Sequence, residues 1–430
     1  MFLGSTLRGA FGHALKQAVC VMSHRACERC LVQDRCIYPY LFETPAPPDA
    51  PLLKGQNHAP HPFILTPPFP KRLSGSTESS ASQSASQYTS RPIAPLPPRA
   101  ISSRSATPVA AGYQSHGRPS GVEIQTVAGG ASSPRSLTGG DLPRLVKGPV
   151  FPARYGHPAL PILSERTLLK KGESLPFDLV LIGRAIDYLP YVVYAVTEMA
   201  RRGLGADRNP FELDDVSVLG CYGVERSIYS GTTQKISVPG GDRASLGDLI
   251  KARMEQYSER ETWSSFQQNG ADTISDSPGL TLNFLTPTRI KINGEPRSAP
   301  SFDLLVRSLL RRVAMLFSMH GSRAFEVDHR TLIERAREVG IRRSKLRWWD
   351  FERYSNRQGR KVKLGGFVGD VEYEIRDELL AEFLPLLAGG EILHIGSNTT
   401  FGLGLCRIVH CWTAAITTAG RDSKDRQRNA

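Results

Sequence analysis

The chain has 430 residues, which is enough for two or three domains with a sizeable apolar core. Lys and Arg number 54 against 41 Asp and Glu, and the net charge of +13 favours a polyanionic partner, nucleic acid first. A hydrophobic fraction of 40% excludes a wholly disordered chain, and no apolar run is long enough to span a membrane. Arg8, His13 and Lys16 interrupt any signal-peptide core, so we expect a cytoplasmic protein without a membrane partner.

The first predicted element is a helix that begins at Gly4-Ser5, with Ser5 as its N-cap. Its residues separate into two faces at helical spacing. The apolar face consists of Leu7, Phe11, Ala14, Leu15 and Ala18, and the other face of His13, Lys16, Gln17 and Cys20. A histidine beside a lysine one turn further along is a candidate for proton-transfer chemistry, although an isolated helical histidine is usually an ordinary surface residue.

Four of the seven cysteines lie close together at the end of this helix. They are Cys20, Cys27, Cys30 and Cys36. Because no export signal is recognised, the spacing indicates a metal knuckle at residues 20–36 rather than a disulfide framework. Structural zinc is the first interpretation, free thiols the second and an iron–sulfur cluster the third. Four thiolates would leave the metal no open position, so we do not expect a catalytic role.

Residues 68–165 are predicted to be a disordered insertion. Between residues 71 and 140 the sequence has 16 Ser, 8 Gly and 7 Pro, with no Phe, Trp or Cys. Such a segment cannot bury enough apolar surface to offset its ordering entropy. It interrupts a predicted β-hairpin at the tip, where a long insertion costs little free energy. Residues 413–430 are predicted to be a disordered tail.

The other elements form two similar halves. After the first helix, the first half has strands at His61–Thr66, Phe177–Arg184 and Asp214–Val224 and a helix from Leu189 to Gly203. The second half has strands at Leu280–Ile292, Arg342–Tyr354, Gly366–Ile375 and Leu403–His410. Its helices are expected at Pro300–Met319 and Asp377–Leu387, and Gly389-Gly390 is expected to end the second of them.

These element orders predict the fold class. The second half, residues 276–412, has the order β-α-β-β-α-β of a ferredoxin-like domain. The first half, residues 1–67 and 166–275, has the same order without an opening strand. The sequence therefore predicts an α+β chain of two tandem ferredoxin-like (βαββαβ) domains, the first truncated at its opening strand and interrupted by the insertion.

Residues 342–363 are the strongest electrostatic feature. They hold nine Lys and Arg residues against Asp350 and Glu352. Four aromatic residues are interleaved, namely Trp348, Trp349, Phe351 and Tyr354. Cations neutralise phosphates and exposed rings stack on unpaired bases, so the pattern is typical of RNA binding, unless the hairpin is merely solvated with alternate aromatics in the core. The candidate RNA-binding cations are Arg347, Arg353, Arg357, Arg360, Lys361 and Lys363.

Three stretches resemble the CRISPR-associated precursor-RNA processing endoribonucleases of the RAMP superfamily. They are Gly4–Gly12, Leu181–Pro190 and the glycine-rich Leu393–Gly404, and the knuckle running into Tyr38, Phe42 and Glu43 is similar to one branch of the family. The resemblance implies tandem ferredoxin-like domains in a prokaryotic protein. Family members usually carry a strand before the first helix, but Met1 almost coincides with that helix, so we expect a start codon assigned too late or a damaged copy.

The resemblance also implies metal-independent cleavage of CRISPR repeat RNA, with no catalytic cofactor. The 2′-hydroxyl attacks the adjacent phosphate, leaving a 2′,3′-cyclic phosphate and a 5′-hydroxyl. His13 is the candidate proton-transfer group with Lys16 beside it, and His394 is the second choice. Arg8 and the glycine-rich loop are expected to contact RNA; the loop residues are Gly396, Ser397, Asn398, Thr399, Thr400, Gly402 and Gly404.

Two other functions fit the same residues. A non-cleaving RAMP scaffold would hold guide RNA inside a CRISPR effector complex. A metal-cluster regulator would act through the cysteines and lose its function on chelation, whereas the nuclease would remain active in EDTA. The expected partners are CRISPR repeat RNA and other CRISPR effector subunits, and the sequence does not define the oligomeric state.

Overall fold

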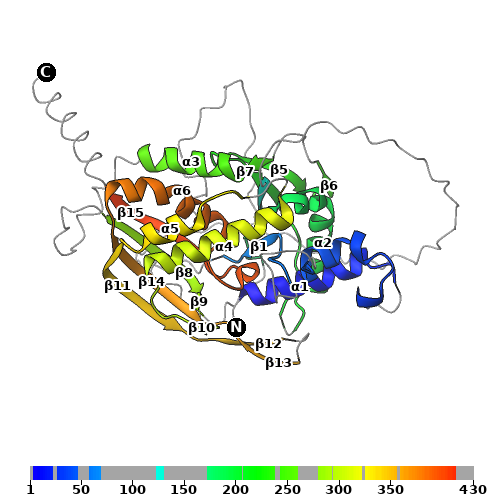
Figure 1. The fold of residues 1–430 in the computed structure, drawn as a ribbon. Coiled ribbons are helices and arrows are strands. Elements are labelled where there is room, and N and C mark those ends of the chain that lie inside the picture. The colour runs from blue at the N-terminus through cyan, green and yellow to red at the C-terminus, as the bar shows by residue number, and fades with distance from the viewer. Residues whose placement is uncertain are drawn as a thin grey trace, which may run out of the picture. The chain divides into compact units, whose positions relative to one another are not determined.

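The computed structural model describes residues 3–22, 27–46, 58–68, 123–129, 172–205, 207–237, 243–259, 279–292, 294–321, 325–355 and 359–412, which belong to one compact unit. Helices and antiparallel sheets alternate along the chain, which confirms the predicted α+β fold with two ferredoxin-like domains (Figure 1). The predicted tail and most of the predicted insertion lie outside the described residues. None of the helices in these ranges is long and apolar enough to cross a membrane.

The C-terminal domain is a four-stranded sheet packed against helices. Its strands are β8 (Gly279–Thr288), β11 (Gly340–Trp349), β14 (Gly366–Glu374) and β15 (Cys406–Trp412), in the order β11-β14-β8-β15. Helices α4 (Phe302–His320) and α6 (Asp377–Leu393) share one buried core with this sheet. Phe302 lies edge-on to Tyr373 of β14 and to Phe383 of α6, with ring centroids 5.1 and 5.2 Å apart. The core therefore joins both helices to the central strands.

Several predicted boundaries in this domain differ from the structure. The strand predicted at Leu280–Ile292 ends at Thr288 and is followed by the separate strand β9 (Lys291–Ile292). Helix α6 continues through Gly389-Gly390, because these glycines allow close packing instead of ending the helix: a Cβ on Gly390 would lie 2.9 Å from the Leu309 side chain. The strand predicted at 342–354 is divided between β11 and β12 (Glu352–Ser355), which forms a separate hairpin with β13 (Arg360–Lys363). Helices α3 (Leu246–Glu259) and α5 (His329–Ala336) were not predicted at all.

The N-terminal domain packs α1 (Leu3–Val19) and α2 (Leu189–Arg202) together with a larger sheet. The sheet has the order β1-β3-β2-β4-β5-β6, with β7 paired to β2. Its strands are β1 (Phe63–Thr66), β2 (Glu123–Gly129), β3 (Phe177–Ile182), β4 (Asp215–Leu219), β5 (Glu225–Ser230), β6 (Lys235–Ile236) and β7 (Ala244–Ser245). The predicted apolar face of α1 is confirmed, because Leu7, Phe11, Ala14 and Leu15 are buried in this domain's core.

Strand β2 takes the place in the sheet that a ferredoxin-like domain gives to its opening strand. In the C-terminal domain that place belongs to β8, which lies between β14 and β15 and is antiparallel to both. In the N-terminal domain β2 lies between β3 and β4 and is likewise antiparallel to both. Strand β2 lies within the insertion predicted at 68–165, where no strand was expected. A strand from the middle of the chain completes the first sheet.

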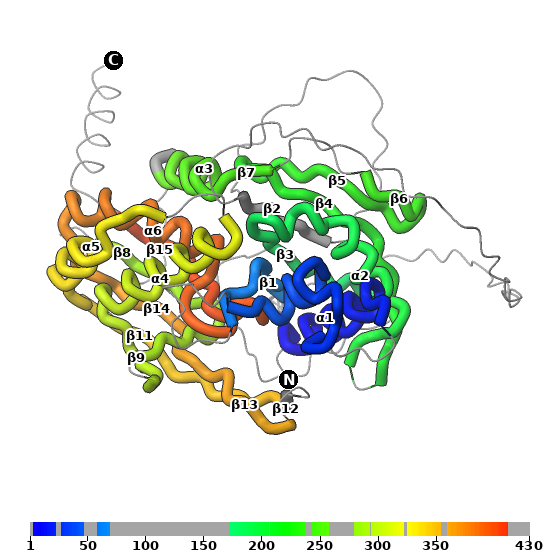
Figure 2. The backbone as a smooth tube through the Cα atoms, turned by 45° about the vertical axis from the view of Figure 1, so that its right-hand side comes forward, coloured from blue at the N-terminus to red at the C-terminus, as the bar shows by residue number. Residues whose placement is uncertain are grey.

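The two domains share apolar contacts. Ile64 of β1 and Ile182 of β3 pack in one buried cluster with Val313 and Leu316 of α4. A short 3-10 turn in the glycine-rich loop, η7 (Thr399–Phe401), also contacts both α1 and β1. Figure 2 shows this red loop of the C-terminal domain beside the blue elements of the N-terminal domain. Residues near the two ends of the sequence are therefore brought to one place.

We predict that residues 123–129 are required for stability. Deleting them would leave the facing backbone N–H and C=O groups of β3 and β4 without partners. We expect the melting temperature to fall by several degrees, since each kcal/mol of destabilisation costs on the order of 1–2 °C in a protein of this size. Deleting the equally long segment 84–90 is the matched control and should leave the melting temperature unchanged. Equal melting temperatures for both deletions would show that β2 contributes nothing to the sheet.

Candidate nucleic-acid interface and cysteine pocket

The glycine-rich loop between α6 and β15 packs tightly on protein backbone. Gly402 has a φ of 78°, and a Cβ there would lie 2.8 Å from the Leu65 carbonyl oxygen of β1. Gly404 also has a φ of 78°, and a Cβ there would overlap the Ile395 carbonyl oxygen. Only glycine tolerates these two positions. Gly402 therefore lets the loop pack against β1, and Gly404 lets the two ends of the loop pack against each other. Both glycines were expected to make room for RNA phosphates, and the structure instead places protein backbone beside them.

The first part of the loop is the part that reaches the surface. Gly396, Ser397 and Asn398 are half-buried, whereas the other four predicted RNA contacts, Thr399, Thr400, Gly402 and Gly404, are buried. Asn398 adopts a left-handed backbone conformation with a φ of 64°, which asparagine tolerates better than most residues. The accessible hydrogen-bonding groups of the loop therefore belong mainly to Gly396, Ser397 and Asn398.

Phe401 in this loop lies next to two guanidinium groups. The Cζ atoms of Arg8 and Arg353 lie 4.7 and 4.6 Å from its ring centroid. Arg8 Nε donates a hydrogen bond to Thr400 Oγ1 at 3.0 Å, and Arg353 Nη1 donates one to Ser5 Oγ at 3.5 Å. The cluster of Arg8, Phe401 and Arg353 thus connects α1, the loop and the β12–β13 hairpin.

Arg353 has unused hydrogen-bonding capacity in this cluster. Its Nε atom is buried and finds no hydrogen-bond partner within the described part of the chain. Desolvation lowers the pKa of its guanidinium group. Two neighbouring arginines concentrate positive charge here, and guanidinium groups bind phosphate oxygens through their accessible N–H donors.

The β12–β13 hairpin presents further cations to solvent. Arg360, Lys361 and Lys363 are exposed, and Arg357 lies outside the described residues. On β11, exposed Arg347 lies over the Trp349 ring, with Cζ 5.2 Å from the centroid. The base of the hairpin is anchored by an apolar cluster that consists of Phe351, Val362, Leu364, Phe401 and Leu403. These cations are therefore solvated, while Phe351, one of the interleaved aromatic residues, packs in the apolar cluster.

His13 lies on an open stripe of α1. Residues four apart share one face of a helix, so Ser5, Gly9 and His13 are aligned. His13 is exposed, and a Cβ built on Gly9 would meet no atom within 4 Å. Arg353 contacts Ser5 at the start of the same stripe. An RNA strand that crosses α1 along this stripe would therefore pass both an exposed imidazole and the arginine cluster.

The other two predicted catalytic residues are placed elsewhere. Lys16 lines a pocket with the cysteines, and its Nζ lies 4.9 Å from the centroid of the Tyr38 ring. His394 is only 3% exposed, and its Nδ1 lies 3.1 Å from the Leu403 carbonyl oxygen. Burial lowers the pKa of His394 to about 3, so its ring is neutral at physiological pH. These positions do not fit the predicted catalytic roles of Lys16 and His394.

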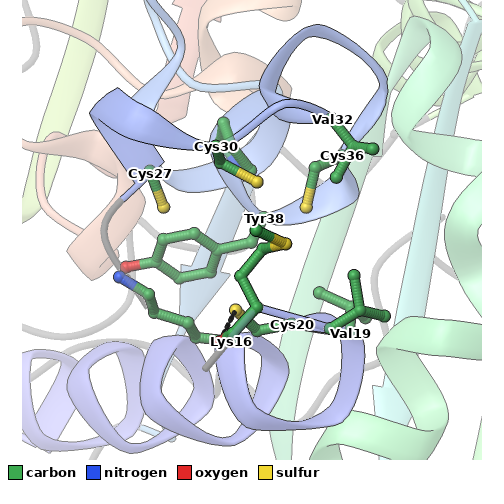
Figure 3. A pocket seen from close by; sticks show the side chains of 11 residues that line it. Lys16, Val19, Cys20, Cys27, Cys30, Val32, Cys36 and Tyr38 are labelled. Carbon is green, nitrogen blue, oxygen red and sulfur yellow. Dashed lines mark hydrogen bonds between the residues drawn. The ribbon is translucent and has the colours of Figure 1, made fainter. Parts of the chain in front are cut away.

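The predicted knuckle cysteines do come together. Cys20, Cys27, Cys30 and Cys36 are half-buried free thiols that line one cavity of about 20 Å³, which is enough for one water molecule or ion. Figure 3 shows the sulfur atoms of Cys27, Cys30 and Cys36 across the pocket from α1. Burial raises the pKa of Cys27 and of Cys36. Among the residues that the structure describes, no three His, Cys, Asp or Glu side chains are already gathered closely enough to hold a metal ion.

Two important contacts were not anticipated from residue patterns. Phe401 was not a predicted site residue. The one sequence feature that could have indicated it is that it is the single aromatic residue in the glycine-rich loop.

The second contact is at His320 of α4, where Nε2 donates to the Pro60 carbonyl at 2.7 Å and Nδ1 accepts from the Tyr40 hydroxyl at 3.2 Å. Burial lowers the pKa of His320 to about 4, so the neutral ring joins the two domains.

Comparisons with known proteins agree with this architecture. Residues 282–406 match the family model of the CRISPR-associated endoribonuclease Cas6. Residues 1–83 and 153–240 match a model described as the N-terminal domain AF_1859_N, and the gap between them contains β2. No curated protein matches the chain.

Several solved structures are similar to the chain. A Cas6 product complex has 18% identity over 67% of this chain and 99% of that chain, with a TM-score of 0.36. Thermus thermophilus Cas6 has 16% identity over 67% of this chain and 99% of that chain, with a TM-score of 0.34. A partial Cas6-RT-Cas1–Cas2 complex has 12% identity over 68% of this chain and 47% of that chain, with a TM-score of 0.39.

The two family models together cover more than half of the chain and coincide with its two ferredoxin-like domains. The glycine-rich loop, which carries the resemblance seen in the sequence, lies within the part matched by the Cas6 model. The C-terminal domain is therefore similar to the Cas6 endoribonuclease family, and the N-terminal domain is similar to the domain described as AF_1859_N.

Proposed function

We propose that this protein binds CRISPR repeat RNA across α1, the glycine-rich loop and the β12–β13 hairpin, and cleaves it without a metal cofactor. The observation that carries the proposal is the cluster of Arg8, Phe401 and Arg353 beside the open stripe of α1 that holds His13. The Cas6 match over residues 282–406 supports it, because it covers both the loop and the hairpin. The expected products carry a 2′,3′-cyclic phosphate and a 5′-hydroxyl.

The reaction needs two proton transfers and positive charge at one phosphate. A base removes the proton of the 2′-hydroxyl, an acid protonates the leaving 5′-oxygen, and a cation stabilises the phosphorane. His13 is exposed, and an imidazole can accept or donate a proton. Arg8 is part of α1 and Arg353 contacts the same helix through Ser5, so both bring charge to a phosphate held on this stripe.

The remaining contacts bind RNA away from the reacting phosphate. Exposed Arg360, Lys361 and Lys363 can neutralise phosphates along the hairpin, and Ser397 and Asn398 offer hydrogen-bonding groups at the loop surface. These groups are held by secondary structure and by the packed loop rather than by free chain. We therefore expect the hairpin to contribute mainly to affinity and α1 to the chemical step.

A non-cleaving RNA-binding subunit is the second candidate function. The observation that favours it is the placement of Lys16 in the cysteine pocket and of His394 in the core, which leaves His13 as the accessible member of the three predicted catalytic residues. A protein that holds RNA without cutting it needs no second proton-transfer group. Cleavage of repeat RNA is therefore the property that separates the two candidates.

We predict that His13→Ala abolishes cleavage of repeat RNA in a single-turnover assay in EDTA. The loss should be about 10²–10⁴-fold in rate with affinity kept within about threefold, because the change removes a proton-transfer group rather than a phosphate contact. Gln17→Ala, which changes an exposed residue of the same helix, is the matched control and should cleave at the wild-type rate. Wild-type protein that binds repeat RNA but leaves it intact would favour the scaffold function.

We also predict that Arg360→Ala/Lys361→Ala weakens RNA binding and flattens its salt dependence. For single-stranded RNA, the slope of log affinity against log salt should decrease by about 0.7 for each phosphate that the variant no longer neutralises. The control is Arg201→Ala/Arg330→Ala, which removes the same charge from exposed sites on α2 and α5. An unchanged slope in the first variant, measured by filter binding at several salt concentrations, would place the RNA path elsewhere.

A further inference from the structure

We propose that Cys20, Cys27, Cys30 and Cys36 bind one zinc ion, which fixes the segment 27–36 to the C-terminal end of α1. The ion would be structural and would lie outside the RNA-cleaving site. The inference does not depend on the proposed function, because metal content can be measured without RNA.

The first observation is that this segment has almost no apolar core of its own. Its two 3-10 turns, η1 (Cys27–Arg29) and η2 (Gln33–Arg35), bury no side chain. Of the apolar residues around them, Leu31 is 93% exposed and Val21 81% exposed. Short 3-10 turns are weak structures in isolation. Something other than hydrophobic burial must hold these turns in place, and a metal ion does so in many small cysteine-rich segments.

The second observation is that the thiols face one cavity from two sides. Cys20 follows the last turn of α1, whereas Cys27, Cys30 and Cys36 come from the turns opposite (Figure 3). The cavity of about 20 Å³ has room for a single ion. Four half-buried thiols around an ion-sized space are a complete donor set for tetrahedral zinc, with no position left for a reacting water.

The charge of such a site can be balanced locally. On binding, each thiol loses its proton to solvent, so four thiolates and one Zn²⁺ carry a net charge of two minus. Lys16 lines the same cavity, and its ammonium lies over the Tyr38 ring. A cation at this position would offset part of that charge. This gives Lys16, which does not fit the predicted catalytic role, a function consistent with its position.

Zinc binding must also draw the turns together. Within the described residues no three donors are yet at metal-binding separation, and zinc–sulfur bonds are about 2.3 Å long. The exposed turns can move without disturbing a packed core, because they bury no side chain. We therefore expect zinc to order residues 27–36 and to leave the two sheets unchanged.

The experiment is to measure the metal content and thermal stability of the full chain purified with zinc in the medium. We expect about one zinc per wild-type chain, and cobalt substitution should give the thiolate charge-transfer and tetrahedral d–d bands of a four-sulfur site. Cys27→Ser/Cys30→Ser should lose the metal, while Cys221→Ser, a half-buried cysteine outside the pocket, should retain it. Zinc removal should lower the melting temperature of wild type and leave that of the Cys27→Ser/Cys30→Ser variant unchanged.

Several results would overturn the proposal. The first is that wild-type protein contains no zinc as isolated and binds none when zinc is added back. The second is that it contains iron and sulfide in place of zinc. The third is an intact mass that shows the four thiols joined in disulfides. Retention of zinc by Cys27→Ser/Cys30→Ser would place the metal elsewhere. If that variant does not fold, the wild-type thiols are titrated with a mercurial reagent instead, and zinc release is measured. The assignment is contradicted if zinc is released without modification of the four pocket cysteines.

Discussion

The packing of the glycine-rich loop between the two domains is the constraint on which the candidate site depends. From the C-terminal side, Thr286 of β8 donates its hydroxyl to the Gly402 carbonyl at 2.9 Å and accepts from the Leu405 N–H at 2.8 Å. From the N-terminal side, Arg8 of α1 donates to Thr400. A loop held by hydrogen bonds to both domains cannot change shape without disturbing one of them. The loop therefore fixes the position of α1 relative to the C-terminal sheet.

This constraint explains why the glycines matter even though they are not exposed. A side chain at Gly402 or Gly404 would collide with backbone and displace Phe401, and the two arginines that lie against that ring would lose their common support. A surface whose cations are already positioned loses less conformational entropy when it binds a phosphate. Gly402 and Gly404 are thus explained by the packing of the loop against protein backbone.

Much of the fold could be predicted from periodicity, and the errors have identifiable physical causes. The apolar face of α1, the helix expected at Pro300–Met319 and the strand expected at Gly366–Ile375 depend on local sequence and are found where they were expected. Gly389-Gly390 was misread because a glycine that ends a helix and one that admits a neighbouring helix look alike in sequence. Strand β2 was missed because its partners, β3 and β4, lie about 50 to 90 residues further along the chain.

The candidate site shows the same limit. That His13 is exposed follows from helical spacing, but the burial of His394 depends on how α6 and the loop fold back on each other. Helical spacing puts Lys16 beside His13 on one face of α1, yet the cysteine turns approach from that side and Lys16 lines their pocket. Residue types can indicate which chemistry is available. Which of those residues remain accessible is decided by tertiary contacts between distant segments.

The position of α1 follows from these tertiary contacts. Phe11 anchors its middle, with ring centroids 5.4 Å from Phe42 and 6.0 Å from Phe63. Arg8 ties its first turns to the loop, and Cys20 places its last turn at the cysteine pocket. His13 lies between these supports, on the side that no core residue covers. Under the proposed function, a helix held in this way would keep the His13 imidazole at a constant distance from the arginine cluster, which is what in-line attack on one chosen phosphate requires.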